Sequence, residues 1–134
     1  MCFSFISSFR FNNYYGIFLG IIEKGYKIIL AHPERYETVK KDYHVLDELK
    51  DIGIIFQSNI GSIFGMYGKD CKKTIKKLLK NNYISMFSSD IHHETYHFSY
   101  MKDIRKKLKK YMTEEEIDDV LINNNKKIIN NEEF

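Results

Sequence analysis

The stretch YKIILAHPERYE, residues 26–37, sets a short apolar run directly before a histidine, a proline, an acid and an arginine. A run of this length, rich in isoleucine, is typical of a strand buried on both faces, as in a parallel sheet. In α/β proteins with parallel strands, ligands bind at the carboxyl ends of the strands. His32 and Arg35 come at that end of this strand, so both are candidate functional residues.

Two more apolar runs end in the same way: residues 52–56 lead into Gln57-Ser58-Asn59, and residues 83–87 lead into Ser88-Ser89-Asp90. Residues 2–6 form a fourth candidate strand. Apolar residues at helical spacing predict helices between and after the strands, over 14–22, 45–52, 71–79 and 101–111, and then a helix that opens with a capping box of Thr113 and Glu116. The alternation predicts an α/β fold with parallel strands, right-handed crossovers and a helical C-terminus.

The composition fits one domain with a hydrophobic core, since the chain has 134 residues, one proline and 43% hydrophobic residues. A net charge of +3 is too near balance for a dedicated nucleic-acid binder. The lysine pairs, such as Lys72-Lys73 and Lys76-Lys77, lie on the polar faces of predicted helices, where a solvated surface is their usual meaning.

Two sequence features bear on location. Cys2 and Cys71 are too few and too far apart for a disulfide framework or a zinc site, which predicts a reducing, cytoplasmic location. The apolar opening, residues 1–22, has no basic segment ahead of it, and Arg10 interrupts it well short of about 20 apolar residues. We therefore expect it to belong to a soluble core, without membrane insertion.

Three residues at the strand ends suggest a metal site. The spacing of Asp90 and His92 lets an extended turn direct both side chains to one side, and His32 ends a second strand. A carboxylate with imidazoles suits Mn, Fe or Zn better than Mg or Ca. Each residue alone has a simpler interpretation, because His32 could be a hydrogen-bonded core histidine and Asp90 a helix cap. Together they favour a metal site.

Other polar groups leave alternatives open. Arg35 could hold phosphate oxygens with its planar fork, or form a surface ion pair with Glu34 or Glu37. The segment from Gln57 to Ser62 could cradle an anion, or be a polar turn that leads into a helix. His44 and His93 have no comparable position, and we expect both at the surface.

In order and spacing, the segments Ala31-His32-Pro33-Glu34-Arg35-Tyr36, Asn59-Ile60-Gly61-Ser62 and Ser89-Asp90-Ile91-His92 resemble one known family. It is the group of bacterial metal-dependent protein-tyrosine phosphatases of the polymerase-and-histidinol-phosphatase (PHP) superfamily, which regulate capsule and exopolysaccharide synthesis. The resemblance implies a distorted (β/α)7 barrel. Its strand-end face would hold up to three metals, usually manganese.

The resemblance also implies roles for individual residues. His32, Asp90 and His92 match metal ligands, and Arg35 matches a catalytic arginine that holds the phosphate. His97 stands where the family has a second phosphate-binding arginine, and we expect Asn59 and Ser62 to contact substrate. The implied reaction is hydrolysis of phosphotyrosine on a protein, such as a tyrosine kinase tail, by a metal-activated hydroxide without a cysteine intermediate.

The sequence departs from the family in two places. The His-x-His strand and acidic turn of the family's first half have no counterpart, and Ser4 stands where the family has a metal-binding glutamate. We therefore expect residues 1–134 to form a single, incomplete PHP-type domain, the C-terminal portion of the barrel. Impaired activity and association with a separately encoded first half or a second copy are expected. Alternatives are a non-catalytic remnant that binds a phosphorylated protein, and a PHP phosphoesterase for a small ester such as histidinol phosphate.

Overall fold

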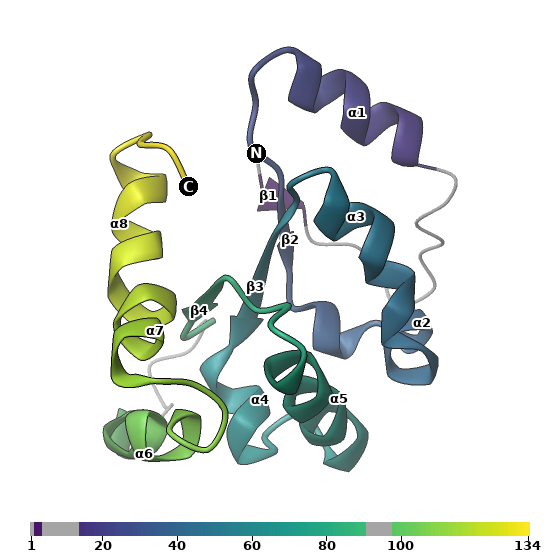
Figure 1. The fold of residues 1–134 in the computed structure, drawn as a ribbon. Coiled ribbons are helices and arrows are strands. Elements are labelled where there is room, and N and C mark those ends of the chain that lie inside the picture. Colours follow the sequence, from purple (N-terminus) through teal and green to yellow (C-terminus); the bar gives the residue numbers. More distant parts are fainter. Residues whose placement is uncertain (1, 4–13, 91–97) are drawn as a thin grey trace.

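A computed structural model describes residues 2–3, 14–90 and 98–134. Four parallel strands form a sheet in which spatial order follows chain order: β1 (Cys2–Phe3), β2 (Ile29–Ala31), β3 (Ile55–Asn59) and β4 (Met86–Ser88). In the register, Leu30 lies opposite Phe56 and Ser58 opposite Phe87. The α/β class and the parallel pairing predicted from the sequence are confirmed (Figure 1).

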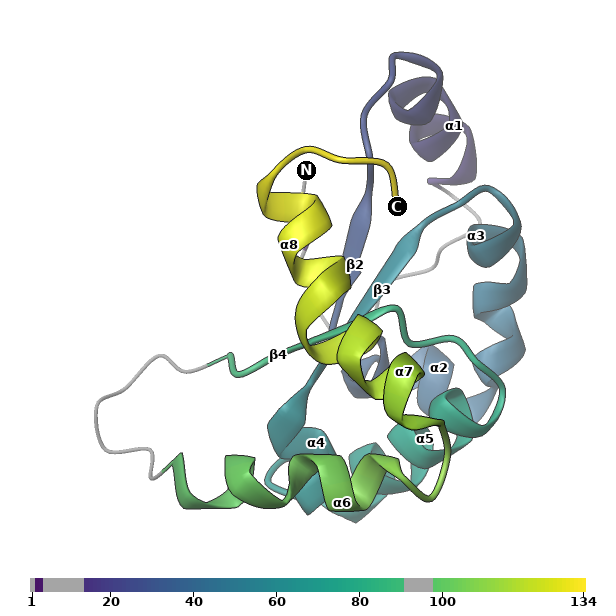
Figure 2. The same cartoon turned by 60° about the vertical axis from the view of Figure 1, so that its left-hand side comes forward.

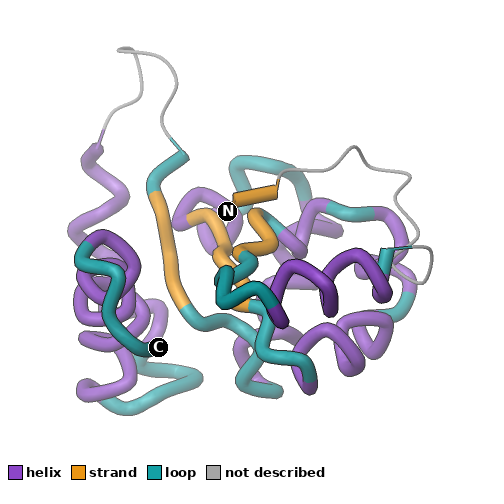
Figure 3. The backbone as a smooth tube through the Cα atoms, turned by 90° about the horizontal axis from the view of Figure 1, so that it is seen from above, coloured by secondary structure: helices purple, strands orange, loops and turns teal. Residues whose placement is uncertain are grey.

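Helices connect the strands and complete the chain. They are α1 (Tyr15–Glu23), η2 (Pro33–Arg35), α2 (Glu37–Lys41), η3 (Tyr43–Leu46), α3 (Asp47–Asp51), α4 (Ile60–Phe64), α5 (Lys69–Lys80), η4 (Phe98–Asp103), α6 (Ile104–Leu108), α7 (Glu114–Asp118), the π-helical η5 (Asp119–Asn123) and α8 (Asn124–Ile129). Figure 2 shows α7 and α8 beside β4. Both η5 and α8 contact this strand. Viewed from above, the strands lie between two groups of helices (Figure 3).

The helices before β2, β3 and β4 all end in the same way. Gly25, Gly53 and Asn82 have φ values of +82°, +83° and +53°. At each end the next residue's N–H returns to a carbonyl five residues back, as in the bond from Tyr26 to Ile21. This is the Schellman motif, which favours glycine or asparagine at the left-handed position. The motif turns the chain from each helix toward the following strand.

Alternating residues of the strands face two separate clusters. Leu30, Phe56 and Phe87 belong to the main core beneath the helices. Ile29, Ile55 and Met86 form a second cluster on the other face, where Ile128 of α8 packs against them. Side-chain amides of Asn124 and Asn125 donate to the carbonyls of Ser85 and Phe87. The C-terminal helix therefore covers part of the second face and satisfies one backbone acceptor in β4 and one just before it.

The predicted capping box is confirmed. The N–H of Glu116 donates to Thr113 Oγ1 at 3.3 Å, and the Glu116 carboxylate accepts from the Thr113 N–H at 2.7 Å. Lys73, Lys76 and Lys77 are exposed on α5, as a solvated face requires. Among the helices of the described ranges, none is both long and apolar enough to cross a membrane.

Tyr83→Phe is expected to lower the melting temperature by a few degrees near neutral pH, and by less at about pH 3. Buried Tyr83 donates a hydrogen bond to Asp47. This bond is the main cause that lowers the pKa of the Asp47 carboxyl, and a hydrogen bond with His44 is the next. A carboxyl with a lowered folded-state pKa stabilises the protein above its unfolded pKa, and loses that contribution as pH falls through the folded value. Thermal melts at both pH values test this, with exposed Tyr26→Phe as control. If the melting temperatures of the parent and Tyr83→Phe differed equally at both pH values, this would count against a role for the Asp47 charge.

Candidate functional site at the strand ends

The carboxyl ends of β2, β3 and β4 carry or lead into His32, Asn59 and Asp90, as expected. His32 follows β2 with φ +43°, and Asp90 lies two residues after β4 with φ +50°. Non-glycine residues seldom adopt this left-handed conformation, which costs about 1–3 kcal/mol, and such residues cluster at functional sites. Both candidate metal ligands thus occupy backbone turns that the surrounding structure has to hold in place.

Arg35, Asn59 and Asp90 meet at one point. The Asn59 side-chain amide donates to Asp90 Oδ2 at 2.7 Å, and Arg35 Nη1 lies 3.4 Å from the same oxygen. The Arg35 guanidinium also lies over the Tyr67 ring, 4.7 Å from its centroid. The side chain of Arg35 is 43% exposed and that of Asp90 16%, so solvent screens the ion pair mainly at Arg35.

The structure does not bear out the proposed ion pair between Arg35 and Glu34 or Glu37. Glu37 pairs with Lys40 at 2.8 Å, and Glu34 is turned into the core. Arg35 lies instead at the strand-end face beside Asp90. Its guanidinium is therefore placed with the other candidate site residues.

Glu34 contacts the candidate residue Asn59, a placement that the sequence argument did not predict. Its carboxyl is fully buried and accepts hydrogen bonds from Ser58 Oγ at 2.7 Å, Ser62 Oγ at 2.5 Å and the Asn59 N–H at 3.1 Å. Burial raises the pKa of Glu34, and the three hydrogen bonds oppose that rise. The only sequence signal was an acid between Pro33 and Arg35, with two serines on another segment.

Ser62 does not lie where a substrate contact would require. It is fully buried in α4, its hydroxyl donates to Glu34, and the thiol of Cys71 lies 3.6 Å from its oxygen. This placement contradicts the expectation that Ser62 contacts substrate, because its hydroxyl serves the buried carboxyl. Residues 57–59 end β3 and residues 60–62 begin α4, so this segment leads directly from a strand into a helix, without the expected turn. Asn59 is also buried, but its amide points toward Asp90.

The donor chemistry of the described residues fits a divalent metal in part. His32 is half-buried at the end of β2, and Asp90 offers a carboxylate beyond the end of β4. His92, His97, His93 and Ser4 lie outside the described residues, and within residues 2–3, 14–90 and 98–134 no three His, Cys, Asp or Glu side chains gather closely enough to hold a metal. His44 is at the surface as predicted, 3.1 Å from Asp47.

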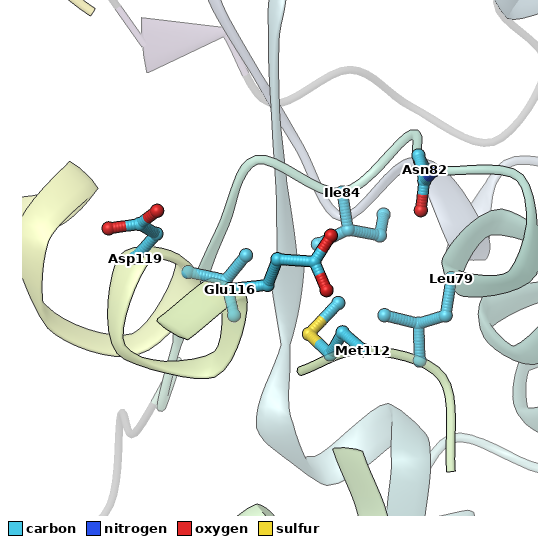
Figure 4. A pocket seen from close by; sticks show the side chains of 7 residues that line it. Leu79, Asn82, Ile84, Met112, Glu116 and Asp119 are labelled. Atoms are coloured by element: carbon cyan, nitrogen blue, oxygen red, sulfur yellow. The ribbon is translucent and has the colours of Figure 1, made fainter. Parts of the chain in front are cut away.

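A separate pocket of about 250 Å³ opens near the amino end of β4 (Figure 4). Four apolar and three polar residues line it: Leu79, Asn82, Ile84, Met112, Glu116, Asp119 and Val120. The carboxylate of Glu116 belongs to the capping box, and Asp119 accepts from the Asn123 side chain. Because none of the candidate residues lines this pocket, it has no part in the strand-end site.

Comparisons with known proteins agree on one family. The model of the family "Capsular polysaccharide synthesis, CpsB/CapC" matches residues 5–130. Tyrosine-protein phosphatase YwqE of Bacillus subtilis (strain 168) is 33% identical over 76 residues, 57% of this chain and 30% of the relative. The Staphylococcus aureus protein named "Putative tyrosine-protein phosphatase CapC" is 30% identical over 118 residues, 87% of this chain and 45% of the relative.

A solved structure agrees with the sequence comparisons. It comes from work on YwqE of Bacillus subtilis and CpsB of Streptococcus pneumoniae, described as metal-dependent tyrosine phosphatases, and it superposes with a TM-score of 0.82 at 25% identity. The match covers 99% of this chain and 53% of that structure. The chain thus spans about half of the solved structure, and less than half of the two relatives. On the family match over residues 5–130, the chain belongs to the CpsB/CapC family of capsular polysaccharide synthesis.

Proposed function

We propose that this chain carries part of the active site of a metal-dependent protein-tyrosine phosphatase, with His32, Asp90 and His92 as ligands of a divalent metal and Arg35 as the phosphate-binding residue. The observation that carries the proposal is the meeting of Arg35, Asn59 and Asp90 at the carboxyl ends of parallel strands. Membership of the CpsB/CapC family, whose relatives are named tyrosine phosphatases, supports it.

Each described residue has a distinct task in this proposal. The Asp90 carboxylate and the His32 imidazole would hold the metal, for which we propose Mn²⁺, and the Asn59 amide orients the carboxylate. Arg35 binds two phosphoryl oxygens through its planar fork, and Tyr67 keeps the guanidinium plane in place. A bound metal ion would supply an activated water and offset charge on the phosphoryl group. His97 remains a predicted second phosphate contact.

We also infer that residues 1–134 are one domain whose sheet is an arc of a (β/α)7 barrel in a cytoplasmic protein. Parallel strands that pair in chain order have the arrangement of such a barrel. Within the described residues β1 and β4 are the outer strands of the sheet, and we propose that the first half of the barrel or a second copy of the chain pairs with them. Light scattering of the purified chain tests self-association, and a stable monomer that melts cooperatively would count against this need for a partner.

The test of function is hydrolysis of an aryl phosphate, a phosphotyrosine peptide and histidinol phosphate by the full chain, with and without Mn²⁺. We expect metal-dependent turnover of the first two, and loss of at least about 10²-fold in His32→Ala, because an outer-shell change alone costs 10–100-fold. Exposed His44→Ala is the matched control and should keep its activity.

Three outcomes would contradict the proposal. Equal turnover by His32→Ala and His44→Ala would exclude His32 from the site. A preference for histidinol phosphate would indicate the small-ester phosphoesterase. Binding of a phosphotyrosine peptide without turnover would indicate the non-catalytic remnant.

A further inference from the structure

We propose that Glu34 is a positioning residue of the strand-end site. Its buried carboxyl connects the turn that carries His32 and Arg35 to the end of β3. It thereby fixes the position of the Asn59 side chain, which donates a hydrogen bond to Asp90. The consequence for catalysis rests on the proposed function. The positioning itself rests on the described hydrogen bonds and can be tested without turnover.

The partners of Glu34 show what the carboxyl does. Oε1 accepts from the Asn59 N–H and from Ser62 Oγ, and Oε2 accepts from Ser58 Oγ, at 3.1, 2.5 and 2.7 Å. These donors belong to β3 and α4, whereas Glu34 belongs to η2. An apolar side chain of similar size would fill this space without the cost of burying a carboxyl. Unlike an apolar side chain, the carboxyl accepts hydrogen bonds that fix the orientation of three donors on two neighbouring elements.

Two paths lead from Glu34 to one oxygen of Asp90. In the first, Glu34 holds the backbone of Asn59, whose side-chain amide donates to Asp90 Oδ2 at 2.7 Å. In the second, burial of Glu34 within the short η2 turn directs the adjacent Arg35 outward, and Arg35 Nη1 lies 3.4 Å from the same oxygen. Anchoring this one side chain therefore fixes two groups that face the candidate metal ligand.

Two substitutions distinguish the hydrogen bonds that Glu34 accepts from the volume that its side chain fills. Glu34→Gln keeps an oxygen for Asn59 and Ser62, and its amide can donate to Ser58 once that hydroxyl rotates. Glu34→Met keeps a similar volume but leaves three donors without an acceptor. Ile117→Ala, which removes a fully buried side chain of α7, serves as a control that destabilises the core elsewhere.

The experiment records the NMR signals of the Asn59 side-chain amide and of Arg35 Nε in the full chain, together with kcat/KM for an aryl phosphate. We expect Glu34→Met to shift both signals and to lower kcat/KM by about 10²-fold, as for a catalytic group displaced by about 1 Å. Glu34→Gln should keep both signals, with kcat/KM within about 3-fold of the parent. Ile117→Ala should leave both signals in place despite its lower melting temperature.

Unchanged Asn59 and Arg35 signals in Glu34→Met, or equal shifts in Ile117→Ala, would overturn the positioning role. If the parent chain does not turn over, the proposed function fails, while the signals still decide the role of Glu34. Should Glu34→Met not fold, the Ser58→Ala/Ser62→Ala double variant removes the two hydroxyls that hold the carboxyl and keeps its bond with the Asn59 N–H. Smaller shifts of the same two signals are then expected, and their absence would overturn the inference.

Discussion

Asp90→Asn is expected to weaken binding of Mn²⁺ to the full chain at least about 100-fold, and to reduce metal-dependent hydrolysis of an aryl phosphate by about 10³-fold. The substitution keeps the shape of the side chain and removes its charge, and a neutral amide is a poor substitute for a carboxylate ligand. It also places an amide where the Asn59 amide now donates at 2.7 Å. Calorimetry with Mn²⁺ and steady-state kinetics measure the two effects.

Phosphate binding without metal distinguishes this prediction from a general loss of structure. Because Asp90 is the carboxylate that lies 3.4 Å from Arg35, the Asn variant should bind inorganic phosphate in the absence of Mn²⁺ at least as well as the parent. Exposed Asp51→Asn, at the end of α3, is the matched control and should change neither quantity. Unaltered Mn²⁺ affinity in Asp90→Asn would remove Asp90 from the set of metal ligands.

The sequence predicted the order and type of the main elements, but the predicted strands for β3 and β4 begin earlier in the chain than the observed ones. Apolar runs at 52–56 and 83–87 were expected to be strands, whereas β3 is Ile55–Asn59 and β4 is Met86–Ser88. The runs mark where side chains are buried, and burial begins before the hydrogen-bonded ladder. β3 continues through Ser58 and Asn59 because buried Glu34 gives these polar residues partners. A single sequence does not show that partner.

The short helices show a second limit. α2 and α4 have five residues each and were not predicted, because neither lies within a longer run of apolar residues at helical spacing, as α3 and α6 do. In contrast, α1 and α5 were predicted nearly to their ends, because each carries several apolar residues at helical spacing. Length of the periodic pattern, more than residue type, decided which helices the sequence revealed.

The site was predictable in its location more than in its contacts. Placing His32, Asn59 and Asp90 after strands was enough to expect them on one edge of the sheet. The left-handed backbone at His32 and Asp90 was not foreseeable, since neither residue type requires it. It was equally unforeseeable that Glu34 points into the core, where its carboxyl accepts a hydrogen bond from buried Ser62. Both depend on contacts between segments far apart in the chain.

Arg35→Lys is the second substitution with a large expected effect. It should lower kcat/KM for an aryl phosphate by about 10–100-fold, because lysine keeps the charge but loses one of two parallel hydrogen bonds to phosphate, each charge-assisted bond being worth about 1.5–3 kcal/mol. It also loses the contact of the guanidinium with the Tyr67 ring, whose centroid lies 4.7 Å away. Mn²⁺ affinity should stay within about 3-fold of the parent, because Arg35 is not a ligand.

Arg105→Lys is a close control, since Arg105 is 42% exposed against 43% for Arg35 and also pairs with carboxylates, those of Glu114 and Asp118. We expect it to leave both kcat/KM and Mn²⁺ affinity unchanged. Equal losses in the two lysine variants would mean that only surface charge had been measured. A fall in Mn²⁺ affinity in Arg35→Lys alone would instead mean that Arg35 acts by orienting Asp90, and the phosphate contact would have to be sought elsewhere on the strand-end face.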